Sequence, residues 1–154
     1  MKTFKIAVVW EQFLAGGVDT YLAELINSWP NHDDHFTIYT NHRNSGEKRL
    51  KELLKADANV RIVYVSSHFI NSFQLSPKLA FRIFRAPLKP ILFVLSILMY
   101  KKYLADGEFD ILIGQNGGYP ASLGVLSGIF AAAWIGIKVR VLVVHHQANQ
   151  ANHA

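Results

Sequence analysis

Two glycine-containing segments each follow an apolar, strand-like run and precede a helix-like segment. They are the Gly16–Gly17 pair and the stretch Gly114–Pro120, of sequence GQNGGYP. Glycine has no Cβ, so a ligand can approach its backbone closely, and the N-terminus of a following helix stabilises an anion such as a diphosphate. The first segment lacks the G-x-G-x-x-G and P-loop spacings, and both segments also fit ordinary tight turns. The sequence therefore leaves two interpretations open, an anion site and a pair of turns.

Polar side chains accompany the second glycine segment and follow the last apolar run. A histidine at the end of a strand can act as a base, donate a hydrogen bond to a sugar or phosphate, or be solvated. The chain has no cysteine, no H-E-x-x-H motif and no cluster with metal-ligand spacing, so we expect no metal site. The candidate site residues in this part of the chain are Gln115, Asn116, Gly117, Gly118, Tyr119, His145 and His146.

A basic helical face is predicted in the middle of the chain. Four cations recur at steps of four, three and four beside an apolar stripe, and no Asp or Glu occurs between Ala58 and Ala105. Such a helix fits an anionic membrane surface, and the alternative is a core-packing helix with a solvated basic face. No nucleic-acid-binding module accompanies the cations, so nucleic acid is not an expected partner. The membrane-surface candidates are Lys78, Arg82, Arg85 and Lys89.

The hydrophobic periodicity predicts an alternation of strands and helices. Alternation with short connections predicts a parallel sheet with helices on both faces, a Rossmann-like α/β fold in which ligands bind at the carboxyl ends of the strands. Tyr21 and Leu53 are among the helical residues expected to face inward. The predicted strands are 3–9, 36–40, 60–65, 110–114 and 138–144, and the predicted helices are 18–29, 47–55, 77–104 with interruptions near Pro87 and Pro90, and 120–136.

Small residues recur every four positions in the last predicted helix, at Gly124, Gly128, Ala132 and Gly136. In an α/β domain this spacing lets a helix approach the sheet closely. The alternative is a helix-pairing face inside a membrane. The strand pattern that follows favours the first interpretation.

Length and composition predict one folded domain over residues 1–154. Hydrophobic residues make up 51% of the chain, and the formal net charge is +5. The absence of cysteine and of a small-residue cleavage site near the N-terminus predicts a cytoplasmic location, with peripheral attachment to the inner face of the membrane as an extension. The apolar run Pro90–Tyr100 is short for a membrane span, and the run 121–137 has about the minimum spanning length. Because a strand-like run follows the second one, a small membrane protein is the least favoured alternative.

Two long stretches of the chain resemble the N-terminal, acceptor-side domain of family-four glycosyltransferases, which have the two-domain GT-B fold. They are FKIAVVWEQFLAGGVDTYLAELINSWP and GEFDILIGQNGGYPASLGVLSGIFAAAWIGIKVRVLVVHHQAN. The resemblance implies transfer of a sugar, with retention, from a nucleotide-sugar donor to a glycan or lipid-linked acceptor. It places Gly16 and Gly17 beside the diphosphate, and it places the stretch from Gln115 to Tyr119 in the acceptor cleft. It implies no cofactor and no metal.

The resemblance also implies what this chain lacks. Asp19 stands where the family more often has Glu, and either His145 or His146 fits the position of the family's histidine, so both remain candidate catalytic residues. The C-terminal domain that supplies most donor contacts has no counterpart, so we expect a truncated N-terminal half that is inactive alone. A non-catalytic nucleotide-binding module is the alternative from a different functional class.

Overall fold

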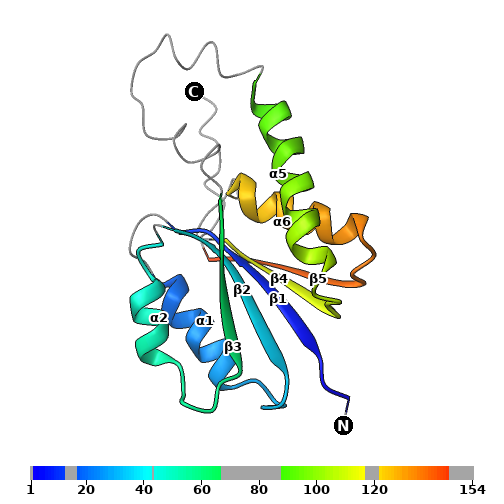
Figure 1. Ribbon diagram of the computed structural model, residues 1–154. Coiled ribbons are helices and arrows are strands. Elements are labelled where there is room, and N and C mark those ends of the chain that lie inside the picture. Colours follow the sequence, from blue (N-terminus) through cyan, green and yellow to red (C-terminus); the bar gives the residue numbers. More distant parts are fainter. Residues whose placement is uncertain (1, 13–16, 43, 67–87, 117–121, 146–154) are drawn as a thin grey trace, which may run out of the picture.

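The computed structural model describes residues 2–12, 17–42, 44–66, 88–116 and 122–145, which form a five-stranded parallel sheet between two layers of helices (Figure 1). The strands lie in the order β3-β2-β1-β4-β5, so the strand order reverses between β1 and β4. The predicted Rossmann-like α/β fold is therefore confirmed. The strands are β1 Lys5–Trp10, β2 His35–Asn41, β3 Val60–Val65, β4 Ile111–Asn116 and β5 Val139–Val144.

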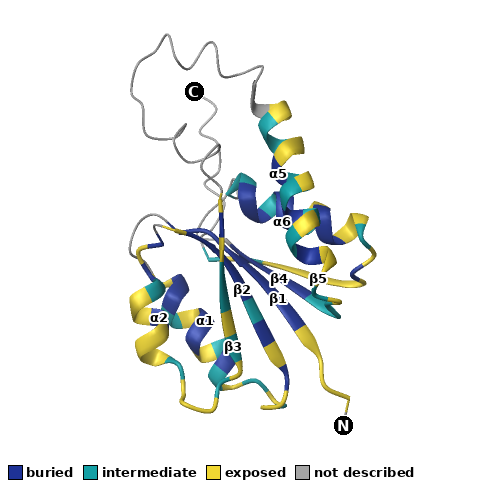
Figure 2. Cartoon of the chain, viewed as in Figure 1, coloured by how far each residue is buried: buried dark blue, intermediate teal, exposed yellow. Residues whose placement is uncertain are grey.

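Helices cover both faces of the sheet, as the alternation predicts. Helices α1 (Val18–Asn27) and α2 (Glu47–Leu53) lie on one face, and α5 (Leu88–Ala105) and α6 (Leu123–Trp134) lie on the other (Figure 1). Alternate residues of β1 point into two separate cores, which explains why its sequence is apolar without interruption. The buried residues accordingly concentrate along the middle strands (Figure 2).

The observed element boundaries correct two predictions and leave a third untested. Strand β4 continues through Gln115 and Asn116, which were predicted to lie in the following loop, because Gln115 pairs with Trp10 of β1 and Asn116 with Val144 of β5. Pro90 does not interrupt a helix but lies in the first turn of α5, where its missing N–H has no intrahelical partner to lose. The predicted helical residues 77–87 lie outside the described residues.

Two side chains expected to face inward are exposed. Leu53 ends α2, where the helix gives way to an extended residue and the inward face is not completed. Tyr21 is 38% exposed because its ring packs edge-on against His145, with the ring centroids 4.7 Å apart, instead of entering the core. Helical periodicity places both residues near the inward-facing side of their helices, but it does not show which residues of that side no longer contact the sheet.

The glycines that recur in and after α6 have two different roles. A Cβ built on Gly128 would lie 2.8 Å from Val9 Cγ2, and one on Gly124 would overlap the carboxylate of Glu11, so these glycines let the helix lie directly on β1. The predicted close approach is confirmed for them, whereas Gly136 lies outside it. Gly136 has φ +86°, and the N–H groups of Gly136 and Ile137 donate to the carbonyls of Ala133 and Ala132, an arrangement that ends α6.

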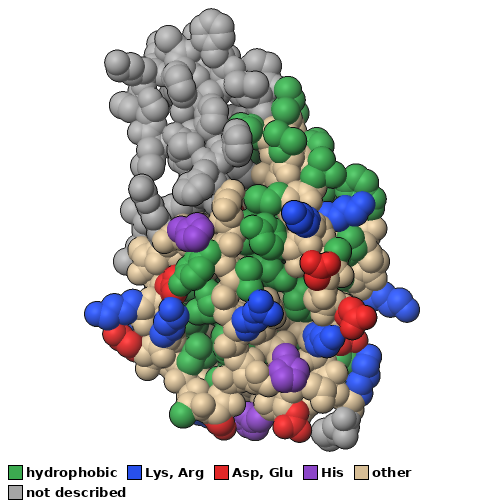
Figure 3. Space-filling view, viewed as in Figure 1, with side chains coloured by type: hydrophobic (Ala, Val, Ile, Leu, Met, Phe, Trp, Pro, Cys, Tyr) green, Lys and Arg blue, Asp and Glu red, His purple; other side chains and the backbone are tan. Residues whose placement is uncertain are grey.

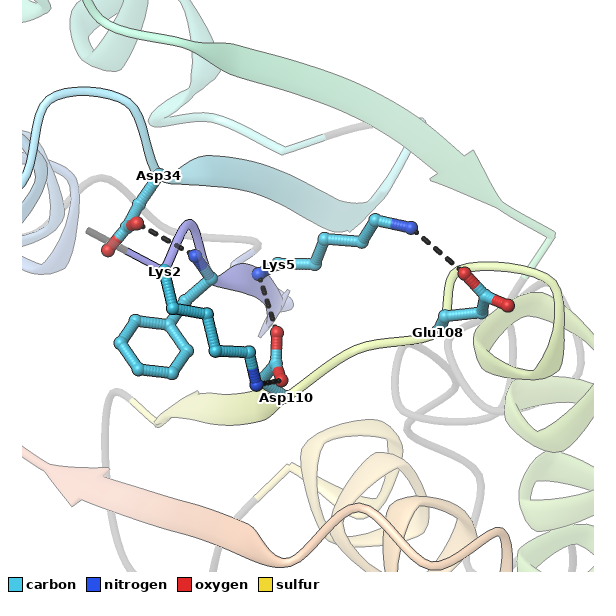
Figure 4. A network of polar contacts seen from close by, with 6 residues as sticks. Lys2, Lys5, Asp34, Glu108 and Asp110 are labelled. Carbon is cyan, nitrogen blue, oxygen red and sulfur yellow. Dashed lines mark hydrogen bonds and ion pairs between the residues drawn. The ribbon is translucent and has the colours of Figure 1, made fainter.

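Two aspartates fix the amino edge of the sheet, which is the side where the N-terminal ends of the strands lie (Figure 4). Asp110 accepts hydrogen bonds from the Lys2 ammonium at 2.9 Å and the Lys5 backbone N–H at 3.0 Å, and these bonds lower its pKa. Asp34 accepts the backbone N–H of Phe4 at 2.8 Å and is itself buried. These bonds join the start of β1 to the residues just before β2 and β4, and so help to fix the register of the three strands along their length.

Candidate functional site

Polar side chains gather at the carboxyl edge of the sheet, where β1, β2, β4 and β5 end. Glu11 and Gln12 follow β1, Asn41 ends β2, Gln115 lies near the end of β4, and His145 follows β5. The first four are buried and His145 is half-buried. A parallel sheet brings all its carboxyl ends to one edge, and this edge includes the point where the strand order reverses. The fold therefore places these side chains where ligands of such sheets bind.

Gln12 is held in place by three hydrogen bonds, which it shares with the side chains of Trp10 and Asn41. The indole Nε1–H of Trp10 donates to Gln12 Oε1 at 3.1 Å. The backbone of Gln12 exchanges hydrogen bonds with the side chain of Asn41, its N–H donating at 3.2 Å and its carbonyl accepting at 3.4 Å. The loop after β1 is thereby tied to the end of β2, and the side chain of Gln12 has one defined position.

The loop after β2 is closed by its own polar residues. Asn44 donates to the Thr40 hydroxyl at 2.7 Å and accepts the backbone N–H of Gly46 at 2.8 Å. A Cβ built on Gly46 would lie 2.9 Å from the Trp10 ring, 3.0 Å from Asp19 Cβ and 3.1 Å from Gln12 Nε2. The glycine is thus needed for close packing, and it brings Gln12 and Asp19 near the same point.

The start of α1 faces this same region. Gly17 is the N-cap and carries no side chain to bond the free N–H groups of the first turn. Asp19 in that turn is buried, and its Oδ2 lies 3.7 Å from the Arg49 Nε. The first turn of α1 therefore presents both backbone donors and a buried carboxylate.

Gln115 and His145 form the other side of the site. The Oε1 of the Gln115 side chain lies 2.9 Å from His145 Nε2, and the two atoms form a hydrogen bond in the tautomer of His145 that carries its proton on Nε2. The edge-on contact with Tyr21 places the imidazole on the α1 side of the sheet. Gln115 itself is completely buried beside Trp10.

Among the described residues, three buried polar atoms of this edge have no hydrogen-bond partner: Gln12 Nε2, Asp19 Oδ1 and Gln115 Nε2. A buried donor or acceptor without a partner costs about 1–3 kcal/mol. All three belong to the α1 side of the sheet, with Gln115 beside Trp10 and with Gln12 and Asp19 around Gly46. The arrangement of two amide donors and one carboxylate acceptor matches a polar ligand that carries hydroxyl groups.

Glu11 lies on the opposite, α6 side of the same edge. Its Oε2 accepts the Ser122 hydroxyl at 2.6 Å and its Oε1 accepts the Tyr100 hydroxyl at 3.2 Å. Burial raises the pKa of Glu11, and the two hydrogen bonds offset part of this rise. Ser122 is the N-cap of α6, but its hydroxyl binds Glu11 instead of capping its own helix. Glu11 therefore joins the end of β1 to the interior of α5 and to the start of α6.

The raised pKa of Glu11 predicts a loss of stability with rising pH. A carboxyl group whose pKa is higher in the folded state stabilises the fold below the ordinary glutamate pKa of 4.5, and this contribution is lost as the pH rises through the raised value. In Glu11→Gln, which cannot ionise, we expect this decline in the urea midpoint to disappear. The exposed Glu24→Gln is the control and should follow the wild-type profile. Parallel pH profiles of wild type and Glu11→Gln would contradict the assignment.

The structure brings together some of the predicted site residues. Gly17, Gln115 and His145 lie at one edge, as predicted, and the backbone of Asn116 lies beside them at the end of β4. Gly16, Gly117, Gly118, Tyr119 and His146 lie outside the described residues, as do Lys78, Arg82 and Arg85. Lys89 lies in the first turn of α5. The described part of the chain contains no His, Asp and Glu group that could hold a metal ion.

Sequence reasoning missed four polar residues of the edge: Glu11, Gln12, Asp19 and Asn41. For Glu11 and Gln12 a signal existed, because they are the first polar residues after a fully apolar strand. Asp19 was noticed only as a departure from a family pattern. Nothing in the sequence shows that Asn41 contacts Gln12, since they are 29 residues apart.

A separate hollow of about 790 Å³ opens near the amino ends of the strands, away from this edge. Its lining includes Lys5, Arg61 and Tyr39, and burial raises the pKa of Tyr39 to about 12. Lys5 is already paired with Glu108 at 3.1 Å. Within the described ranges, no helix is long and apolar enough to cross a bilayer.

No protein-family model matches the chain, and no curated protein sequence matches it. Its fold is similar to that of a Listeria monocytogenes protein assigned as a UDP-N-acetylglucosamine 2-epimerase, over 94% of this chain and 31% of that protein, with a TM-score of 0.52 and 12% identity. A second UDP-N-acetylglucosamine 2-epimerase structure matches over 91% of this chain and 33% of its own, with a TM-score of 0.49 and 16% identity. The chain thus spans about a third of the length of these proteins. The first likeness shows a shared GT-B-type, Rossmann-like fold, whereas the resemblance to family-four glycosyltransferases stays a prediction.

Proposed function

We propose that this chain supplies one half of a nucleotide-sugar site in a GT-B-fold enzyme. The observation that carries the proposal is the set of three buried, unpartnered atoms at the carboxyl edge, Gln12 Nε2, Asp19 Oδ1 and Gln115 Nε2. A sugar hydroxyl both donates and accepts, so hydroxyls can complement two amide donors and one carboxylate oxygen. A sugar or ribose at this edge would remove the desolvation cost of all three atoms.

The start of α1 supports the diphosphate part of the ligand. The N–H groups of its first turn have no partner within the helix, and they stabilise phosphate oxygens. Among the described residues, nothing lies within 4 Å of a Cβ built on Gly17, so the backbone is open to approach there. Asp19 carries a negative charge in the same turn, so we expect the phosphates nearer Gly17 and the hydroxyls nearer Asp19.

The finer proposal is that the enzyme transfers a sugar with retention from the nucleotide-sugar donor to a glycan or lipid-linked acceptor. The sequence resemblance supports this reaction, and His145 at the same edge is the described candidate for contact with the acceptor. The Listeria monocytogenes protein of similar fold is assigned as a UDP-N-acetylglucosamine 2-epimerase, so UDP-N-acetylglucosamine is the first nucleotide-sugar to test.

The exposed apolar side chains of strand β5 support the proposal that the functional protein contains additional chain. Val139 and Val141 are exposed on one face of this strand, and Leu142 and Val144 are exposed on the other. Parallel sheets bury both faces of such strands, and among the described residues β5 pairs only with β4. We propose that additional chain covers β5 in the functional protein, that a second domain supplies most donor contacts, and that this chain alone does not turn over a nucleotide-sugar.

The test is a titration of the ¹⁵N-labelled chain with UDP-N-acetylglucosamine, with UDP and with N-acetylglucosamine. The side-chain NH₂ signals of Gln12 and Gln115 report directly on the two unpartnered donors. We expect both signals to move with UDP-N-acetylglucosamine, with a dissociation constant in the millimolar range because half of the site is missing. Micromolar binding of UDP alone would show instead a self-sufficient nucleotide-binding module. Unchanged signals with all three compounds would contradict the proposal.

Methionine substitutions separate a binding role from a structural role. Gln12→Met and Gln115→Met each remove an unpartnered buried donor together with one hydrogen bond, so we expect the free energy of unfolding to change by no more than about 1 kcal/mol. We expect each substitution to weaken binding of UDP-N-acetylglucosamine about tenfold. The control Asn59→Met removes an exposed amide at the amino edge and should change neither quantity. A large loss of stability with unchanged binding would show that the glutamines are structural.

A further inference from the structure

Helix α5 carries an apolar stripe that stays exposed in the part of the chain that the structure describes. Ile91, Val94, Leu95 and Leu98 are 56, 52, 50 and 44% exposed, and their spacing of three, one and three residues places them on one side of the helix. The other side of α5 packs into the protein, with Tyr100 and Leu104 buried. Figure 3 shows hydrophobic side chains gathered over α5. The stripe therefore faces outward while the helix stays anchored to the domain.

Cations and a tryptophan border the stripe. The Lys101 ammonium lies 4.4 Å from the centroid of the Trp134 ring, and Trp134 is 60% exposed on α6. Lys102 is also exposed, and the chain has no acidic residue from Ala58 to Ala105. Tryptophan and lysine at the edge of an apolar surface are the side chains that settle at the level of lipid headgroups.

We propose that the exposed stripe of α5, with Lys101 and Trp134 at its border, binds the surface of an anionic lipid bilayer. The aliphatic side chains would enter the boundary between headgroups and acyl chains, and the ammonium groups would contact lipid phosphates. The helix would lie on the membrane and not across it, because its opposite side belongs to the core of the domain.

The extent and charge of the surface favour lipid over a second copy of the chain. Four half-exposed aliphatic side chains offer much less than the roughly 800 Å² per partner that a standard protein interface buries. A second copy would also bring Lys101 and Lys102 of the two chains toward one another, whereas anionic headgroups attract them. This proposal does not depend on the proposed nucleotide-sugar site.

The exposed stripe of α5 lies toward the same end of the domain as the candidate site. The first half of α5 projects beyond the carboxyl edge of the sheet (Figure 1). A bilayer that contacts the stripe would therefore lie toward the same end of the domain as Gln115 and His145. An acceptor embedded in that bilayer would reach this end of the domain without leaving the lipid.

The test is co-sedimentation of the full chain with vesicles of phosphatidylcholine alone and of phosphatidylcholine mixed with phosphatidylglycerol. We expect binding to the anionic vesicles that weakens with added salt, and little binding to the neutral ones. Val94→Glu and Lys101→Glu should each lower the partition coefficient about tenfold or more. A blue shift of tryptophan fluorescence on binding should be lost in Trp134→Phe.

Matched variants make the outcome decisive. Val139→Glu changes a valine that is 49% exposed on β5, and Lys48→Glu makes the same charge change on α2, so both should bind vesicles within about twofold of wild type. Circular dichroism checks that every variant is folded. The proposal is overturned if the wild-type chain does not bind anionic vesicles, or if Val139→Glu reduces binding as much as Val94→Glu. It is also overturned if light scattering shows a dimer that Val94→Glu dissociates while vesicle binding is absent.

Discussion

Gly128→Leu is expected to lower the free energy of unfolding by about 3 kcal/mol. The first added atom would lie 2.8 Å from Val9 Cγ2 and 3.3 Å from Val9 Cβ, and three more carbons would follow it. Val9 is completely buried in β1, between β2 and β4, so it has no space into which to move. The higher helix propensity of leucine offsets only about 1 kcal/mol of this cost. Urea unfolding followed by circular dichroism measures the difference.

The control for this substitution is Ala133→Leu in the same helix. Ala133 is exposed, so the added atoms meet solvent and the free energy of unfolding should stay within about 0.5 kcal/mol of wild type. Equal losses in the two variants would show that α6 does not depend on close contact with β1. The comparison thus tests the packing of the helix separately from its intrinsic helix propensity.

The arrangement of the fold could be predicted because its determinants are local. Apolar runs without alternation indicate strands buried on both faces, and the small residues at Gly124 and Gly128 indicate a helix that lies close to a strand. Gly136 has the same spacing, yet it ends the helix with a positive φ. Spacing alone cannot separate these roles, because the reversal toward β5 depends on where the last turn of α6 meets the sheet.

The candidate site could be predicted only in outline. The rule that ligands bind at the carboxyl ends of parallel strands predicted that Gln115 and His145 lie at one end of the sheet, and their side chains are in contact there. The partners of Gln12 follow from the register between β1 and β2, which brings Asn41 beside a residue 29 positions earlier. A pattern of residue types does not contain that register. The unpartnered state of Asp19 Oδ1 likewise emerges only when the side chains are packed together.

Trp10→Ala is expected to lower the free energy of unfolding by about 4 kcal/mol. The indole is completely buried at the end of β1, in the core beneath α1. Its removal leaves a cavity beneath Gly46, whose backbone packs directly on the ring. The loss is measured as a shift in the urea midpoint, and a change of less than about 1 kcal/mol would contradict the role assigned to the ring.

Trp10→Phe tests the link between this core residue and the site. Phenylalanine keeps most of the apolar volume but removes the donor to Gln12 Oε1, so a smaller loss of about 1–2 kcal/mol is expected. The Gln12 side chain would lose its anchor, and its NH₂ signal and the affinity for UDP-N-acetylglucosamine should both change. Trp29→Phe is the matched control, since it removes an indole donor to Asp34 near the amino edge of the sheet. It should cost similar stability while leaving the Gln12 signal and the affinity unchanged, because the site depends on where the lost hydrogen bond lies and not on stability alone.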